Sequence, residues 1–121
     1  MTESNIHLRC CPRIESTFPI VFAGDHFVGE GTVVNMSVPG CAVQSKMPVR
    51  AGDYLELRVI VLEEGVPLRI HLARVRWSQG KTFGLEFIRM PGSDQVRLGR
   101  IVKQHARTSL PSPQQPWRAV L

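Results

Sequence analysis

This 121-residue sequence has few cysteines, few lysines and no long apolar run. Its 3 cysteines are an odd number, and Cys10 and Cys11 are adjacent, so no disulfide framework is predicted. A reducing compartment is therefore expected, because disulfides are rare in such compartments. The longest apolar run, from Val59 to Leu62, has the length of a strand and is far too short for a membrane span. We expect a cytoplasmic protein with no membrane insertion.

The sequence also lacks the patterns that support catalysis. It contains no nucleophile–base pair, no glycine-rich phosphate loop and no cluster of paired carboxylates. Cys10, Cys11 and Cys41 with His7 match no common zinc spacing, so neither a metal nor a cofactor is expected. The sequence therefore predicts a binding protein rather than an enzyme.

Arginine is the residue type present in excess. Only three of the 15 basic residues are lysines, the formal net charge is +5 and the pI is about 9.7. This balance favours an anionic partner such as a nucleotide, a nucleic acid or a membrane surface, although a genome rich in arginine codons would produce the same bias. The apolar fraction of 43% and the charged fraction of 21% indicate one folded domain with a modest core.

Short stretches of alternating apolar and polar residues dominate the middle of the chain. Turn-forming residues separate these stretches, a pattern typical of a small antiparallel barrel or sandwich. The six predicted strands run over residues 14–22, 27–35, 41–47, 55–61, 66–72 and 83–87.

Three details of the strand pattern predict irregularities. Pro19 cannot donate a ladder hydrogen bond, so we expect the first strand to lie partly at an edge. Gly29 and Gly31 indicate a bulge or strong curvature in the second strand. The apolar positions are even-numbered up to Leu72 but odd-numbered at Val75 and Trp77. This shift predicts either a bulge near Ala73 or an outward-facing indole.

A helix is predicted after the last strand. Ser93 suits the N-cap position and Asp94 the positively polarised first turn. Leu98, Ile101 and Val102 form a one-sided apolar stripe, which is typical of a helix packed on a core. We expect a flexible lead over residues 1–8, one domain over 9–108, and a proline-rich flexible tail over 109–121.

Two short motifs carry most of the functional information. Arg9 and Arg13 precede the first predicted strand, and guanidinium groups bind phosphates and stack on planar rings. Asn35, Ser37 and Gly40 combine an amide, a hydroxyl and a glycine in a turn, where a ligand could approach the backbone. Each motif alone also fits two solvated arginines or an ordinary turn. Together they suit an anionic, planar ligand.

The order of these motifs, RxxxR over residues 9–13 and NxSxxG over residues 35–40, resembles the PilZ family. The stretches 73–77 and 83–87 are also similar to the end of the PilZ barrel, with its G-x-x-F signature. The resemblance covers roughly residues 9–107. It implies an all-β fold, a split barrel of six antiparallel strands, with a C-terminal helix.

PilZ domains bind the bacterial second messenger cyclic di-GMP and relay its concentration to motility, biofilm or polysaccharide machinery. The resemblance implies that Arg9 and Arg13 contact the phosphates and guanines, that Asn35 and Ser37 hydrogen-bond a guanine, and that Gly40 permits the turn. Such contacts suit the ligand, since arginine pairs well with guanine O6 and N7. An unidentified downstream protein would be the second partner.

Trp77 and Leu8 extend this prediction. An outward Trp77 beside Arg74 and Arg76 could stack a base, whereas an inward indole would join the core. Many relatives carry a further arginine at the position of Leu8, so the leucine implies one nucleotide per chain instead of a stacked pair.

Two other functions remain open at this point. A PilZ-like protein could bind no nucleotide and act only through protein contacts with pilus or flagellar machinery. A small basic barrel could bind RNA or DNA, but that function needs exposed aromatics among basic residues, and only Trp77 qualifies clearly. We therefore expect no nucleic-acid partner, and a monomer or weak homodimer.

Overall fold

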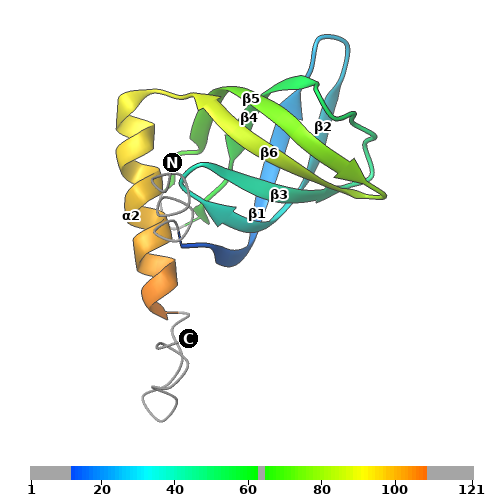
Figure 1. Ribbon diagram of the computed structural model, residues 1–121. Helices are drawn as coiled ribbons and strands as arrows, with labels where there is room; N and C mark the ends of the chain where they lie inside the picture. The colour runs from blue at the N-terminus through cyan, green and yellow to red at the C-terminus, as the bar shows by residue number, and fades with distance from the viewer. Residues whose placement is uncertain (1–11, 63–64, 109–121) are drawn as a thin grey trace, which may run out of the picture.

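The computed structural model describes residues 12–62 and 65–108. It contains six strands followed by one helix (Figure 1). The elements are β1 (Ile14–Ala23), β2 (Val28–Ser37), β3 (Gly40–Ser45), β4 (Tyr54–Val59), β5 (Leu68–Gln79), β6 (Thr82–Arg89) and α2 (Gly92–Thr108). The lead over residues 1–8, the tail over 109–121, and Arg9 lie outside the described residues.

The strands form a closed antiparallel barrel in the order β1-β2-β3-β6-β5-β4. This confirms the predicted six-stranded barrel with a C-terminal helix. Strand β1 pairs with β2 along most of its length but with β4 only over residues 20–23. Pro19 lies just before the β4 pairing begins, and its carbonyl accepts a hydrogen bond from the Ile60 N–H at 2.8 Å. A proline is tolerated there because that position contributes an acceptor only.

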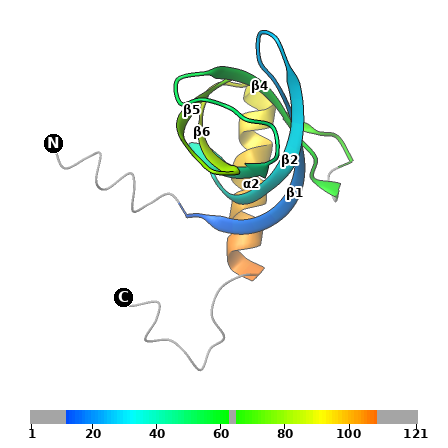
Figure 2. The same cartoon turned by 90° about the vertical axis from the view of Figure 1, so that its right-hand side faces the viewer.

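The core lies inside the barrel and beneath the helix. Alternate residues of each strand point inward, as the period of two predicts. Helix α2 crosses one end of the ring of strands (Figure 2) and places Leu98, Ile101 and Val102 in the core at about 1% exposure. Burying each of these side chains contributes roughly 1.5–3 kcal/mol. Within the described ranges, no helix is both long enough and apolar enough to span a membrane.

Of the two alternatives predicted at Gly29 and Gly31 of β2, the bulge does not occur there, and the close packing of both glycines fits strong curvature. A Cβ on Gly29 would lie 2.6 Å from the ring of Phe22, and one on Gly31 would lie 2.4 Å from the carbonyl oxygen of Gln44. The register of β2 against β3 shifts later, at Val34. The glycines therefore allow the barrel wall to curve tightly, and the bulge lies nearer the predicted binding residues.

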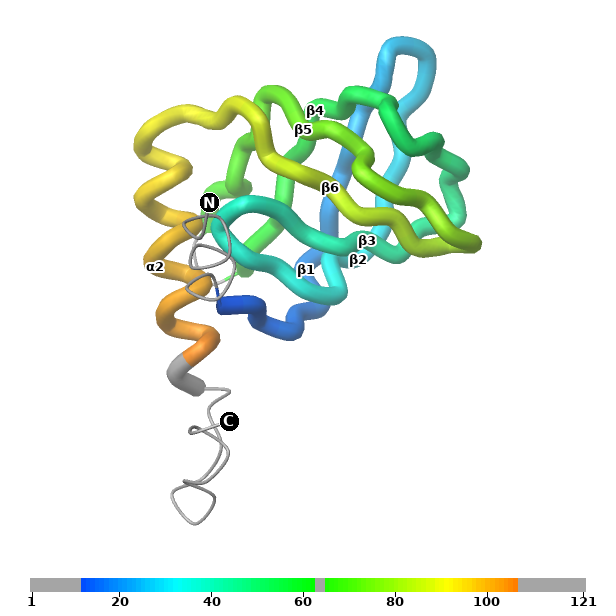
Figure 3. The backbone as a smooth tube through the Cα atoms, in the orientation of Figure 1, coloured from blue at the N-terminus to red at the C-terminus, as the bar shows by residue number. Residues whose placement is uncertain are grey.

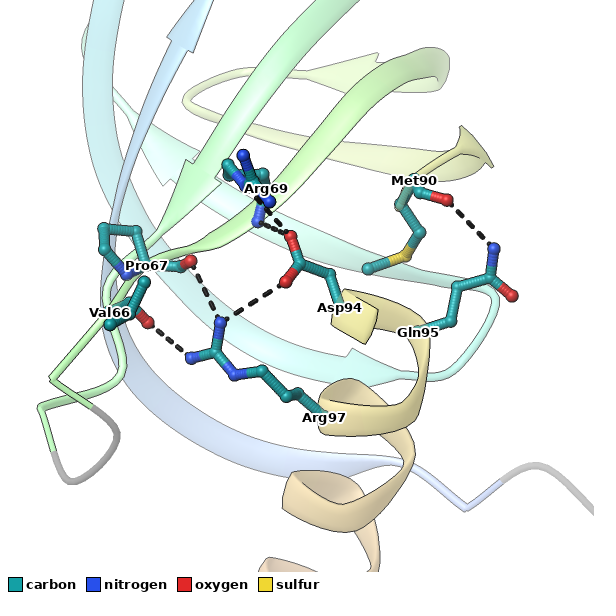
Figure 4. A network of polar contacts seen from close by, with 7 residues as sticks. All are labelled: Val66, Pro67, Arg69, Met90, Asp94, Gln95 and Arg97. Atoms are coloured by element: carbon teal, nitrogen blue, oxygen red, sulfur yellow. Dashed lines mark hydrogen bonds and ion pairs between the residues drawn. The ribbon is translucent and has the colours of Figure 1, made fainter. Parts of the chain in front are cut away.

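The helix begins two residues earlier than the sequence predicts. The Gln95 N–H donates to the Pro91 carbonyl at 2.9 Å, so Pro91 occupies the cap position assigned to Ser93. The Gln95 side-chain amide also donates to the Met90 carbonyl at 3.0 Å (Figure 4).

Asp94 joins the helix to the barrel. Its side chain is only 4% exposed, and its carboxylate accepts hydrogen bonds from the backbone N–H of Arg69 at 3.0 Å and from the Arg69 Nε at 3.3 Å. Arg97 contacts the other carboxylate oxygen at 3.4 Å and also donates to the carbonyls of Val66 and Pro67 (Figure 4). The sequence predicted only a favourable first-turn charge. We call Asp94, Arg69 and Arg97 the helix clamp.

Candidate functional site

A cavity of about 350 Å³ lies on the outside of the barrel, over β2, β3, β6 and β5. These strands are neighbours in the barrel order, and β3, β6 and β5 can be followed side by side in Figure 3. The cavity wall includes five of the six residues that the sequence singled out: Arg13, Asn35, Ser37, Gly40 and Trp77. The sixth, Arg9, lies outside the described residues and stays a prediction.

Strand register explains how residues so far apart in sequence meet. Asn35 on β2 is paired with Ala42 on β3, Ala42 with Gly84 on β6, and Gly84 with Trp77 on β5. Directly paired residues of antiparallel strands point to the same face. The four residues therefore form one row across the outer surface. We call this row the outer row; its two central members are small, so the floor between Asn35 and Trp77 is low.

The indole of Trp77 lies over Gly84. A Cβ on Gly84 would fall 2.2 Å from the indole Nε1 and 2.5 Å from Cε2, so only glycine leaves room for the ring. Trp77 is 45% exposed, which places it on the surface and not in the core. The register of β5 against β6 also shifts between Leu72 and Ala73, so both of the alternatives predicted for this strand occur.

Ser37 and Gly40 form the opposite corner of the cavity, at the two-residue turn between β2 and β3. The Ser37 hydroxyl donates to the Gly40 carbonyl at 3.3 Å, and Ser37 is only 7% exposed. This bond fixes the hydroxyl at the cavity wall. It leaves the oxygen lone pairs as acceptors for a ligand.

Gly40 is required for a reason that the sequence did not predict. It does not have a positive φ; in the described ranges only three other glycines do. A Cβ on Gly40 would lie 2.1 Å from the carbonyl oxygen of Leu85 on β6, so a side chain would push the two strands apart. The turn is held to the same strand by a bond from the Phe87 N–H to the Pro39 carbonyl, at 2.9 Å.

Two charged residues of the cavity were not chosen as ligand contacts from the sequence. Arg76 Nη1 lies 3.2 Å from Glu86 Oε1, and their side chains are 56% and 48% exposed. An ion pair so exposed contributes at most about 1 kcal/mol to stability. With Arg13, the lining thus carries two guanidinium groups and one carboxylate. The nearest sequence signal was the position of Arg76 beside Trp77.

Cys41 also borders the cavity, but its thiol belongs to the core. The residue is 7% exposed, and burial raises the pKa of the Cys41 thiol from 9.0 to about 12. It is therefore a neutral thiol at physiological pH, unsuited to nucleophilic or metal-binding chemistry. Cys10, Cys11 and His7 lie outside the described residues, and no metal-binding group of side chains occurs within those ranges.

A sequence model of the PilZ domain family matches residues 7–104, which is most of the chain. This chain belongs to the PilZ family. No curated protein matches its sequence.

Solved structures show the same PilZ fold at low sequence identity. The Bacillus subtilis inhibitor of motility MotI (DgrA) has 19% identity and a TM-score of 0.69 over 84% of this chain, but this chain spans only 52% of that protein. The PilZ domain of Escherichia coli YcgR, solved with c-di-GMP, has 14% identity and a TM-score of 0.65, covering 82% and 92% of the two chains. The PilZ domain of CeSA from a cellulose-synthesizing bacterium has 18% identity and a TM-score of 0.62, covering 77% and 96%.

Proposed function

We propose that this PilZ domain is a cytoplasmic receptor for cyclic di-GMP and acts as a binding module rather than an enzyme. The observation that supports this most is the single cavity lined by Arg13, Asn35, Ser37, Gly40 and Trp77. The E. coli YcgR domain of the same fold was solved with this nucleotide. The cavity volume of about 350 Å³ falls within the range of small-molecule sites, roughly 300–1,000 Å³.

The chemistry of the wall suits a cyclic dinucleotide with two phosphates and two purines. Arg13, joined by Arg9 from the preceding segment, neutralises phosphate and offers a flat guanidinium face to a base. Trp77 presents a partly exposed indole on which a purine can stack. Asn35, at the end of the outer row opposite Trp77, and Ser37 on the same strand would supply hydrogen bonds to a guanine edge.

The same arrangement supports a role as an adaptor. Arg13 leads directly into β1, so a ligand bound by Arg13 and Arg9 draws the N-terminal segment onto the outer row. The bound state then presents a surface that the free state lacks, and a partner protein can distinguish the two. A ligand drives this change only because it binds the chain with the N-terminal segment on the outer row better than it binds the chain without that contact.

Calorimetric titration with cyclic di-GMP, cyclic di-AMP and GTP tests the proposal. We expect the chain to prefer cyclic di-GMP and to bind one molecule per chain. Arg13→Ala should weaken binding at least about tenfold, since a charge-assisted contact is worth roughly 1.5–3 kcal/mol. Arg58→Ala is the matched control, because Arg58 is an exposed arginine on β4, away from the cavity. Equal affinities of the Arg13→Ala and Arg58→Ala variants would contradict the assignment.

One observation favours a second candidate, a PilZ domain that works through protein contacts alone. A groove of about 290 Å³ lies between the end of β6 and α2, lined mainly by apolar residues that include Val38, Phe87, Ile88 and Met90. Val38 and Ile88 are 48% and 47% exposed, an arrangement common at protein interfaces. This candidate predicts that the chain binds none of the three nucleotides.

A further inference from the structure

Glu86 is an unexpected residue for a cavity that binds a dianion. It is the only acidic side chain among the described residues that line the cavity. Its carboxylate repels phosphate, and the repulsion is strongest where water is excluded. Such a group weakens ligand binding unless the ligand offers it hydrogen-bond donors. A ligand bound here must therefore turn a part that carries hydrogen-bond donors toward Glu86.

The register places Glu86 beside the corner formed by Ser37 and Gly40. Glu86 is paired with Gly40 on β3, and Gly40 is in turn paired with Ser37 on β2. These residues form a second row, next to the outer row on the same surface. Gly40 has no side chain, so the space between the Glu86 carboxylate and the Ser37 hydroxyl is open to a ligand.

Among the described residues, only one of the two carboxylate oxygens has a partner. Oε1 accepts from Arg76 at 3.2 Å. Arg74 is paired directly with Glu86 across β5 and β6 but forms no ion pair with it, and Oε2 has no hydrogen bond within residues 12–62 and 65–108. Arg76 therefore orients the carboxylate while leaving its second oxygen available.

We propose that Glu86 makes the site selective for guanine. Guanine carries two adjacent donors on its Watson–Crick edge, N1–H and the 2-amino group, and a carboxylate accepts from both. Adenine presents a lone pair at N1, which the carboxylate repels. The penalty against adenine and the attraction to guanine act together, as is usual in selective sites. This inference rests on the proposed function, because it assigns a role within the same cavity.

The variant Glu86→Gln tests it, with cyclic di-GMP and cyclic di-AMP titrated in parallel by calorimetry. Glutamine keeps the size and one acceptor but removes the charge and adds a donor that suits adenine N1. We expect cyclic di-GMP to bind about tenfold more weakly, the scale of one charge-assisted hydrogen bond. Cyclic di-AMP should bind more tightly than to the wild-type chain, so the preference for guanine should fall by more than about tenfold.

Two control variants separate direct contact from indirect effects. Glu56→Gln removes an exposed carboxylate on β4, outside the cavity, and should leave both affinities unchanged. Arg76→Gln breaks the ion pair but keeps the Glu86 carboxylate. It should keep a preference for guanine, although a smaller one than the wild-type chain, because the acceptor remains while the guanidinium that orients it is gone.

The outcomes are distinct. A Glu86→Gln variant that loses affinity for both nucleotides equally would show that Glu86 only positions Arg76, and would overturn the inference. Equal gains for both would show simple repulsion of phosphate, which also overturns it. In both cases the wild-type chain still binds cyclic di-GMP, so the proposed function survives. A wild-type chain that binds neither nucleotide would overturn the proposed function and this inference with it.

Discussion

The described residues form two clusters of arginine with a carboxylate, and the two clusters differ in burial. Asp94 in the helix clamp is 4% exposed and has contacts on both oxygens, whereas Glu86 in the cavity is 48% exposed and has a contact on one. Water competes little with the first cluster and strongly with the second. Similar residue types thus serve different purposes: the buried cluster holds the helix on the barrel, and the exposed cluster stays available to a ligand.

Breaking the helix clamp should have the largest effect on stability. Asp94→Ala removes the acceptor for the Arg69 backbone and for Arg97, which is 17% exposed at its side chain. Losing one partner of a buried ion pair costs about 3–5 kcal/mol, since the remaining charge is desolvated. Urea unfolding followed by circular dichroism measures this change. Asp94→Asn, which keeps one acceptor oxygen, should be less destabilising. A loss below about 1 kcal/mol in Asp94→Ala would show that the clamp is dispensable.

The substitution Gly84→Ala should have an effect of intermediate size, and it should change the affinity for the nucleotide more than the free energy of unfolding. Gly84→Ala puts a methyl group where the indole of Trp77 lies, so the partly exposed ring must move. Base–aromatic stacking is worth about 1–3 kcal/mol per base, so affinity for cyclic di-GMP should fall by about tenfold. The indole emission, recorded in a Trp117→Phe background, should shift in parallel.

A double-mutant cycle provides the control for Gly84. In a Trp77→Ala background, Gly84→Ala should change the affinity little, because the ring that it displaces is already gone. Independent, additive effects of the two substitutions would argue that Gly84 acts on the sheet and not through the indole.

Breaking the exposed ion pair should have the smallest effect on stability. Glu86→Ala and Arg76→Ala should each change the free energy of unfolding by less than about 1 kcal/mol, as is usual for solvated pairs. The same urea titrations used for Asp94 measure this. A loss comparable with that of Asp94→Ala would remove the distinction between the two clusters.

Local sequence patterns predicted the barrel but only part of the site. The alternation in the strands and the apolar stripe that includes Leu98 and Ile101 both arise because one face of each element is buried. A buried face repeats every two residues in a strand and about every 3.6 residues in a helix, so it can be recognised in the sequence. The outer row depends on register, which a single extra residue such as Val34 changes. No local pattern predicts that the Asp94 side chain is buried, because its burial depends on contacts with Arg69 on the distant strand β5.

The site residues illustrate the same limit. Asn35, Ser37 and Gly40 were identified through a motif whose spacing is local. Arg76 and Glu86 belong to different strands and meet only because β5 pairs with β6. Gly40 was expected to serve its own turn, but its requirement comes from the carbonyl of Leu85 on the neighbouring strand.

The turn between β2 and β3 separates the cavity from the groove beside α2. Its two residues border different hollows: Pro39 lines the cavity, and Val38 lines the groove beside α2. The Pro39 carbonyl is tied to the Phe87 N–H, and Phe87 borders the groove as well. A ligand in the cavity that displaced this turn would therefore also change the shape of the groove beside α2, with no need for the barrel itself to deform.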